Sequence, residues 1–274
     1  MITKEMPVEK QTKERRTETI MQAGTPERQN EIVITELVKK FGDISAVDGL
    51  NLEIRKGEMF DFLGPNGAGK TTTISMLSGL LALTSGSAQI GGFDISTESH
   101  KVKELIGVCP QEVAVYKFLT GMENIILFGK LHGMEKQQLK ERAQALVSQA
   151  DFSDAAKRRS KGYSGGMMRQ LNLMIALISD PEILFLDEPT VGMDARARRK
   201  TWEYIGSLKD QGKTVILTTH YIEEAQALSD RVGIIDYGEL VDLGTPQELM
   251  VKHDAEDLER VFLKITGRRI TEGL

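Results

Sequence analysis

The segment GPNGAGKTT, residues 64–72, has glycines, a lysine and threonines at the spacing of a phosphate-binding loop. It fits the pattern G-x-x-x-x-G-K-[ST], follows an apolar run and precedes a helical pattern, as that loop requires. In such a loop the backbone N–H groups surround phosphate oxygens, Lys70 reaches the β and γ oxygens, and the Thr71 hydroxyl ligates Mg²⁺. The candidate nucleotide-binding residues are therefore Gly64, Pro65, Asn66, Gly67, Ala68, Gly69, Lys70, Thr71 and Thr72.

Two carboxylates follow a second apolar run, in the segment ILFLDEPT. An isolated Asp-Glu pair is usually a solvated strand end, but a pair directly after a buried strand lies at the carboxyl edge, where open sheets bind ligands. There Asp187 can hold Mg²⁺ through water, and Glu188 can polarise the water that attacks a phosphate. We expect both to face the phosphate loop.

Two further side chains end predicted strands at the same edge. His220 follows the apolar run TVILTT, and its place favours contact with a γ-phosphate over the more common structural role of a lone histidine. Gln111 ends a short strand in GVCPQE, and it is either an ordinary surface glutamine or a ligand that completes the Mg²⁺ shell.

A second anion-binding arrangement occurs at Ser164, Gly165 and Gly166, immediately before a long apolar helical pattern. A helix N-terminus offers unpaired N–H groups and a positive dipole, and glycines let a phosphate come close. A chain with one nucleotide pocket has no evident need for this second turn.

These residues must be positioned by strands that alternate with helices. We expect an edge strand at residues 31–41, a second strand at 49–57, buried parallel strands before Gly64, Glu188 and His220, and short strands within 231–244. The pattern from about residue 113 to 180 is nearly all helical and predicts an inserted lobe. Residues 1–30 are polar and lack periodicity, so we expect a disordered tail there.

Composition limits the classes of partner. The chain has 274 residues, 40% of them hydrophobic and 27% charged, with a net charge of −5, which does not favour nucleic-acid binding. The single cysteine, Cys109, excludes an internal disulfide and suits a reducing compartment. No apolar run reaches the ~18 residues of a membrane-spanning helix.

Taken in order, these motifs resemble the ATP-binding subunit of an ATP-binding-cassette (ABC) transporter over about residues 31–265. KKFGDISAVDGL resembles the family's adenine-stacking loop with Phe41 as the aromatic, and PQE resembles its Q-loop. YSGGMMRQ resembles the family signature, LFLDEPT the Walker B strand, VGMD the D-loop with Asp194, and TTHYIEEA the switch loop.

The resemblance implies an α/β phosphate-loop fold: a RecA-like parallel-sheet core, an N-terminal antiparallel β subdomain and an inserted helical subdomain, with residues 266–274 as a C-terminal tail. It also implies ATP and Mg²⁺ as ligands, with Glu188, His220 and Lys70 as the catalytic residues and Thr71, Gln111 and Asp187 at the metal.

The implied partners are a second ATP-binding subunit, most simply a second copy of the chain, and an integral membrane permease. The implied location is the cytoplasmic face of the cell membrane, reached through the permease. In the family, each ATP lies between the phosphate loop of one subunit and the Ser-Gly-Gly turn of the other, which explains the second turn.

Finer features resemble the drug- and antibiotic-resistance exporter ATPases of the daunorubicin-resistance type: Tyr163 and Met167 beside the signature, and the segments GTPQEL and LERVFLKITGR. The substrate is then a drug, an antibiotic or a lipid-like molecule. Asp61 departs from the family pattern, because it puts a carboxylate at a strand position where the family usually has a small or apolar residue. Either it has a basic partner or it lowers stability.

Three alternatives remain open on sequence alone. A non-transport ABC ATPase that acts on ribosomes or DNA usually has two cassettes or long coiled coils, and this chain has neither. A GTPase would need an N-K-x-D motif, which is absent. A scaffold without activity is weakened by the presence of Lys70, Glu188 and His220.

Overall fold

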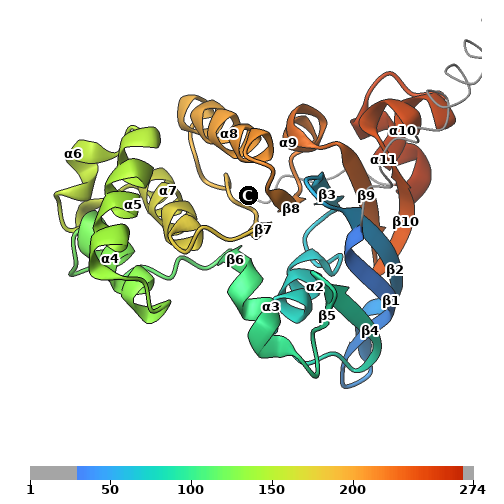
Figure 1. The fold of residues 1–274 in the computed structure, drawn as a ribbon. Coiled ribbons are helices and arrows are strands. Elements are labelled where there is room, and N and C mark those ends of the chain that lie inside the picture. Colours follow the sequence, from blue (N-terminus) through green and yellow to red (C-terminus); the bar gives the residue numbers. More distant parts are fainter. Residues whose placement is uncertain (1–29, 268–274) are drawn as a thin grey trace, which may run out of the picture.

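The chain is described here as a computed structural model of residues 30–267. The predicted N-terminal tail, apart from Asn30, and most of the predicted C-terminal tail lie outside the described residues. Figure 1 shows three regions: an antiparallel sheet, a larger sheet with flanking helices, and a separate helical lobe on the left.

The first sheet is antiparallel and has the strand order β2-β1-β4-β5. The sequence prediction of an edge strand at residues 31–41 is wrong, because this segment pairs on both sides. Its unforeseen neighbour is SGSAQI, whose small and polar residues carry little strand signal. The strands are β1 (Asn30–Phe41), β2 (Ile44–Arg55), β4 (Ser85–Ile90) and β5 (Phe93–Asp94).

The second sheet has the order β10-β9-β3-β8-β7-β6, and its pairings are parallel except at β10. Every residue of β3, β7 and β8 is buried, as expected for a sheet covered on both faces. The predicted buried strands are therefore confirmed. The strands are β3 (Met59–Leu63), β6 (Ile106–Cys109), β7 (Ile183–Asp187), β8 (Thr214–Thr219), β9 (Arg231–Asp236) and β10 (Glu239–Gly244).

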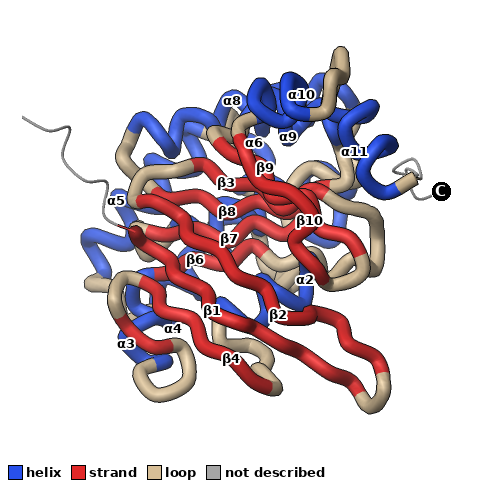
Figure 2. The backbone as a smooth tube through the Cα atoms, turned by 90° about the vertical axis from the view of Figure 1, so that its right-hand side faces the viewer, coloured by secondary structure: helices blue, strands red, loops and turns tan. Residues whose placement is uncertain are grey.

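The two faces of this sheet pack against different layers (Figure 2). Phe60 and Phe62 of β3 belong to the core beneath the first sheet, whereas Met59 belongs to the core on the helical face. This alternation follows from the two-residue repeat of a strand. The helices of the core are α2 (Lys70–Leu77), α3 (Ser99–Leu105), α8 (Ala195–Asp210), α9 (Ile222–Leu228), α10 (Pro246–Lys252) and α11 (Leu258–Thr266).

The helical lobe lies in the chain between β6 and β7, where the sequence predicts it. Its first helix begins with a capping box, in which Thr120 accepts from the backbone N–H of Glu123 and the Glu123 carboxylate accepts from that of Thr120. The lobe consists of α4 (Gly121–Leu131), α5 (Lys136–Gln149), α6 (Ser153–Ala156), the 3₁₀ turn η1 (Ser160–Gly162) and α7 (Gly165–Leu177).

Asp61 lies in the middle of β3, is 0% exposed, and neither carboxylate oxygen has a hydrogen-bond partner among the described residues. Burial, and then the charge of Glu224, raise the pKa of Asp61 well above its ordinary value, and Lys70 offsets this only in part. The fold therefore favours the protonated form of this carboxyl more than the unfolded chain does. Of the two sequence alternatives, the structure favours a destabilising buried carboxyl over an ion pair.

Candidate active site

The phosphate loop connects Leu63, the last residue of β3, to Lys70, the first residue of α2. Gly69 caps this helix with φ 102°, a backbone conformation that residues with a side chain rarely adopt. A Cβ atom at Gly69 would lie 2.4 Å from the carbonyl oxygen of Ala46, and one at Gly64 would lie 2.3 Å from that of Ile235. Both positions therefore need glycine.

Lys70 is 4% exposed, and its ammonium group lies inside the loop. Nζ donates to the carbonyl oxygens of Gly64 at 2.6 Å and Pro65 at 3.0 Å, and it lies 3.8 Å from Oε1 of Glu188. Burial lowers the pKa of Lys70, while the nearby carboxylates of Glu188, Asp61 and Asp187 oppose this shift.

Asp187 ends β7 opposite the loop. Its Oδ1 accepts from the Thr71 hydroxyl at 3.1 Å and from the Thr218 hydroxyl of β8. Burial raises the pKa of Asp187, against the effect of these two hydrogen bonds. A hydroxyl and a carboxylate in contact form the all-oxygen donor set that Mg²⁺ prefers, so these residues fit that ion.

Glu188 is the next residue and directly follows the strand. Its backbone φ is 49°, a conformation that residues other than glycine seldom adopt. Its Oε1 lies 3.1 Å from Nδ1 of His220, and its Oε2 accepts from Nε2 of Gln111 at 3.3 Å. Burial favours a higher pKa, but the hydrogen bond and charge of His220, with Lys70 and Arg169, outweigh it. The pKa of Glu188 is therefore lowered, and the group is an ionised base at neutral pH.

A cavity of about 230 Å³ opens beside these groups. The structure brings into its wall eight of the predicted site residues, six from the loop and two that follow strands, together with one residue that sequence reasoning missed. The predicted residues are Asn66, Gly67, Gly69, Lys70, Thr71 and Thr72, with Gln111 and Glu188, and the missed one is Ala46.

Other predicted residues lie outside this cavity. Phe41 ends β1 and is 51% exposed, with Nζ of Lys39 5.0 Å from the centre of its ring. It shares the β1–β2 hairpin with Ala46, which does line the cavity. The structure thus places the expected adenine platform on the same hairpin but not in the cavity wall.

The Ser164-Gly165-Gly166 turn also lies outside the cavity wall. Ser164 caps α7 by accepting from the backbone N–H of Met167 at 3.3 Å. A Cβ atom at Gly166 would lie 3.5 Å from the Met193 side chain, so the turn packs beside the segment before α8. The Asp194 carboxylate caps α8 by accepting from the backbone N–H groups of its first turn at 3.0 and 2.9 Å.

Sequence reasoning missed two polar residues that hold the site together. The Thr218 hydroxyl contacts both Asp187 and, at 3.1 Å, the backbone N–H of Glu188. Its place two residues before the histidine in TTH was an available signal. Arg169 of α7 donates to the carbonyl oxygen of Gln111, a contact between residues 58 positions apart that no local pattern reveals.

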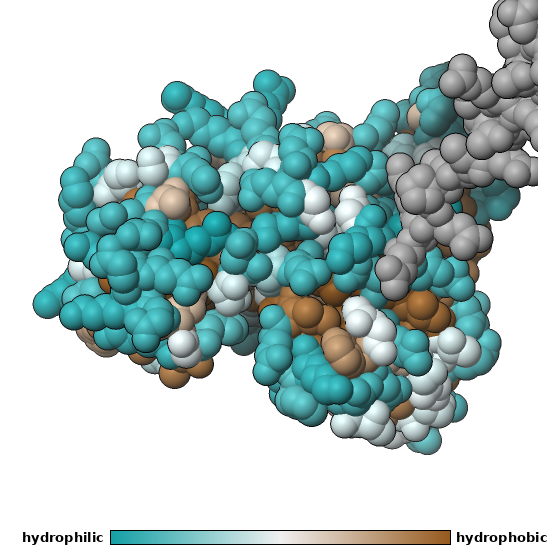
Figure 3. Space-filling model, in the orientation of Figure 1, coloured by the Kyte–Doolittle hydropathy of each residue, from teal (hydrophilic) through white to brown (hydrophobic). Residues whose placement is uncertain are grey.

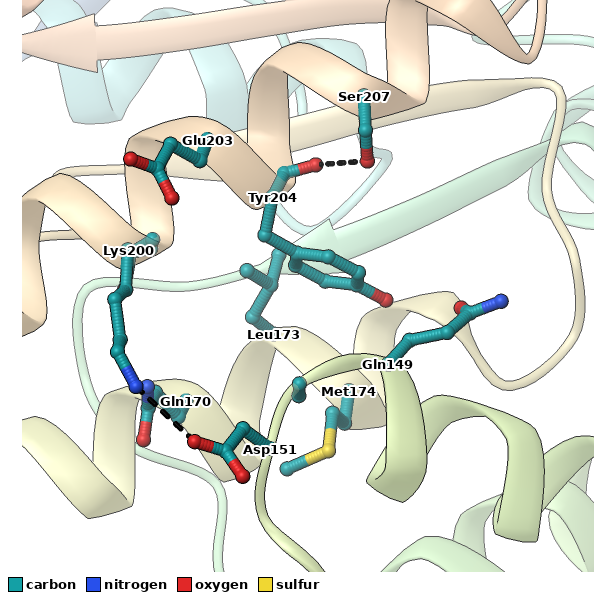
Figure 4. Close-up of a pocket in the computed structure, with 11 residues that line it drawn as sticks. Gln149, Asp151, Gln170, Leu173, Met174, Lys200, Glu203, Tyr204 and Ser207 are labelled. Atoms are coloured by element: carbon teal, nitrogen blue, oxygen red, sulfur yellow. Dashed lines mark hydrogen bonds and ion pairs between the residues drawn. The ribbon is translucent and has the colours of Figure 1, made fainter.

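A second cavity, of about 340 Å³, lies between the helical lobe and α8 and contains none of the predicted site residues. Its floor includes Leu173, Met174 and Tyr204. Figure 4 shows the ion pair that crosses it, Lys200 of α8 with Asp151 after α5, at 3.0 Å. Both partners of this pair are at least half exposed.

A loop that binds phosphate, at the carboxyl edge of a parallel sheet and faced by an Asp-Glu pair and a histidine, defines a phosphate-loop nucleotide hydrolase. The chain belongs to the ABC transporter family, whose sequence profile matches residues 47–191. Within that family it is similar to ATP-binding proteins of drug and antibiotic resistance.

Two relatives show this placement. The linearmycin resistance ATP-binding protein LnrL of Bacillus subtilis is 44% identical over 211 residues, which cover 77% of this chain and 68% of the relative. The doxorubicin resistance ATP-binding protein DrrA of Mycobacterium tuberculosis is 43% identical over 243 residues, which cover 88% of this chain and 72% of the relative.

Solved structures show the same fold. An ATP-binding subunit of an ABC transporter aligns with a TM-score of 0.78 at 22% identity, covering 86% of this chain and 99% of that one. A dimeric post-hydrolysis state of an ATP-binding cassette, bound to ADP and Pi, aligns with a TM-score of 0.72 at 25% identity, covering 78% and 98%. The predicted fold class is confirmed. Between residues 30 and 267, no helix is long and apolar enough to cross a membrane.

Proposed function

We propose that this chain hydrolyses ATP to drive the export of a drug, antibiotic or lipid-like molecule through a separate membrane permease. The observation that carries the proposal is the contact of Glu188 with both His220 and Gln111, beside Lys70 and the phosphate-loop cavity. The names of the two relatives support export rather than action on ribosomes or DNA.

In the proposed reaction, Lys70 and the backbone N–H groups of the loop hold the phosphates, and the ionised carboxylate of Glu188 accepts a proton from the attacking water. His220 orients Glu188 and contacts the γ-phosphate. Thr71, Asp187 and Gln111 would hold Mg²⁺, which neutralises phosphate charge. Phe41 stacks on the adenine.

The remaining ATP-binding residues act from a second copy of the chain. Ser164, Gly165 and Gly166 lie outside the cavity wall of their own subunit, so a head-to-tail dimer is the arrangement in which they reach a nucleotide. The dimeric form of the related cassette with ADP and Pi supports this geometry. Asp194 then lies at the interface between the subunits.

The proposed contact with the permease is the segment between Gln111 and α4. Its aromatic residues Tyr116 and Phe118 are 57% and 77% exposed, and Tyr116 packs on Phe128 of α4 with ring centres 6.3 Å apart. Figure 3 shows hydrophobic colour along the lower margin of the helical lobe. An exposed apolar segment joined directly to the nucleotide site suits a partner that must sense hydrolysis.

The proposed organisation has one ATP-binding domain at residues 31–265, with the helical subdomain at about 113–180 and tails at 1–30 and 266–274. The proposed location is the inner face of the cell membrane, reached through the permease.

The test is phosphate release from ATP by the purified chain, with and without a membrane permease that co-purifies with it. We expect Mg²⁺-dependent release that a transported drug alters when the permease is present. No ATP hydrolysis in either preparation would falsify the catalytic part of the proposal. ATP hydrolysis by a chain that binds no permease would contradict the part of the proposal that concerns export.

A further inference from the structure

The residue after the switch histidine packs against it. The ring centres of His220 and Tyr221 lie 4.3 Å apart with the planes tilted by 40°. On the Tyr221 ring lies the Arg198 guanidinium of α8, 5.0 Å from the ring centre, and the same guanidinium lies 5.8 Å from the centre of the Trp202 ring. Arg198 and Tyr221 are only partly exposed, a setting in which a cation–π contact is stronger than at an open surface.

A second, independent contact joins the same elements. Glu224, in the first turn of α9, is 0% exposed, and its Oε1 accepts from the Thr190 hydroxyl and from Nε1 of Trp202, each at 2.8 Å. Thr190 follows Glu188 by two residues, and Trp202 lies one turn beyond Arg198 on α8. One buried carboxyl therefore binds the segment after the catalytic base, helix α8 and helix α9.

Both contacts converge on α8, whose N-terminal cap is Asp194. Asp194 is one helical turn from Arg198, and Arg198 is one turn from Trp202, so the three residues lie along one side of the helix. A displacement of the start of α8 therefore moves the groups that hold the His220 ring and the segment after Glu188.

From these contacts we infer that Tyr221 and Glu224 are positioning residues, which transmit the placement of α8 to the His220–Glu188 pair. Tyr221 restricts rotation of the imidazole, because its ring occupies one side of the histidine and is itself held by Arg198. Glu224 sets the distance between α8 and the segment that follows Glu188. The inference rests on the proposed function, because Tyr221 and Glu224 can have this role only if Glu188 takes part in ATP hydrolysis.

The first test replaces Tyr221 in the full-length chain. Tyr221→Leu removes the aromatic ring, and we expect kcat for ATP to fall by up to about tenfold, the fold-change that corresponds to one aromatic contact, while KM changes by less than about twofold. Tyr221→Phe keeps the ring and should restore most of kcat.

A matched control is Phe93→Leu in the first sheet, where Nζ of Lys101 lies 4.8 Å from the centre of the Phe93 ring. This control also loses a ring covered by a cation, and it should keep wild-type kcat. Thermal unfolding of each variant separates a loss of fold from a loss of positioning.

The second test is a double-mutant cycle. In a His220→Ala background, Tyr221→Leu should cause almost no further loss, because the ring that it positions is absent. Trp202→Phe, which removes the donor to Glu224, should lower kcat about fivefold, as expected for one hydrogen bond.

Full kcat in Tyr221→Leu, or an undiminished loss in the His220→Ala background, would overturn the inference while the proposed hydrolysis stands. A wild-type chain without ATP hydrolysis would instead overturn the proposed function itself.

Discussion

His220 and Glu188 face each other with Nδ1 and Oε1 3.1 Å apart, and each side chain is 6% exposed. Each directly follows one of two adjacent parallel strands, His220 after β8 and Glu188 after β7. Because the histidine and the nearby cations lower the pKa of Glu188, the carboxylate is ionised at neutral pH despite its burial. The pair therefore provides a base that is ready to accept a proton and held in one orientation.

The first prediction concerns this base. Glu188→Gln keeps the size and the contact with Gln111 but removes the proton acceptor, so we expect phosphate release to fall by about 100-fold or more. Binding of a fluorescent ATP analogue should remain near wild type. The control is Glu182→Gln immediately before the same strand, where the side chain is 60% exposed; this variant should keep full turnover. Normal turnover in Glu188→Gln would remove this residue from the role of base.

The second prediction concerns the phosphate loop. Gly69→Ala places a Cβ atom 2.4 Å from the carbonyl oxygen of Ala46 and forces alanine to φ 102°, so the loop or the β1–β2 hairpin must shift. We expect ATP affinity to fall at least about tenfold and the melting temperature to drop. The matched control is Gly206→Ala in α8, where a Cβ atom meets nothing within 4 Å; it should raise stability by up to about 1 kcal/mol. Calorimetric titration with ATP and thermal unfolding measure both effects.

The third prediction concerns the signature turn. A Cβ atom at Gly165 has only the Gly192 carbonyl nearby, at 3.9 Å, so Gly165→Asp fits the monomer. Its charge repels a phosphate brought by the other subunit. We expect turnover to collapse while monomeric ATP binding persists. Gly162→Asp, whose Cβ atom would meet nothing within 4 Å, is the control and should hydrolyse normally.

The same dimer predicts how wild-type activity depends on protein concentration. Specific activity should rise with concentration, because each complete site needs two chains. Constant specific activity down to dilutions at which sedimentation shows only monomers would contradict the shared site.

The fourth prediction uses the raised pKa of Asp61. The folded chain retains the proton that the unfolded chain releases above about pH 3.8, so the free energy of unfolding falls as pH rises from there toward the folded pKa. Asp61→Asn has no proton to release. We therefore expect the two proteins to be equally stable below that pH and the variant to gain an advantage of up to about 1.4 kcal/mol per pH unit above it.

Urea unfolding across this pH range measures the difference, and Asp242→Asn is a control of opposite sign. Asp242 is bonded to Lys252 and His253, and these contacts outweigh burial and lower its pKa. Its ionisation therefore stabilises the fold above about pH 3.8, and removing it should cost stability there. A pH-independent effect of Asp61→Asn would show that its carboxyl is already ionised in the fold.

Local patterns predicted the elements that carry chemistry, because a phosphate loop and a charged pair after a buried strand have short-range signatures. Lys70 and Glu188 both line one cavity, with Nζ 3.8 Å from Oε1. The sheet neighbour of β1 could not be predicted, because SGSAQI has little strand preference of its own and owes its conformation to pairing with β1 on one side and β5 on the other.

Contacts between distant segments were also beyond sequence reasoning. Nothing near Arg169 indicates that it donates to the carbonyl oxygen of Gln111, since the two residues meet only when the helical lobe packs on β6. Whether Asp61 has a basic partner likewise depends on the residues around it in the folded chain. Sequence reasoning identified it as a departure, but the lack of a hydrogen-bond partner among the described residues emerges only when the fold encloses it.

The cavity between the helical lobe and α8 lies where two kinds of contact, one polar and one apolar, join the lobe to the rest of the molecule. The Lys200–Asp151 pair that crosses it is exposed, and exposed pairs contribute about 0.2 to 1 kcal/mol, which is comparable to thermal energy. This pair therefore adds little to the attachment of the lobe. The attachment depends instead on the buried apolar core that Leu173 and Met174 of α7 share with Ile205 and Leu208 of α8.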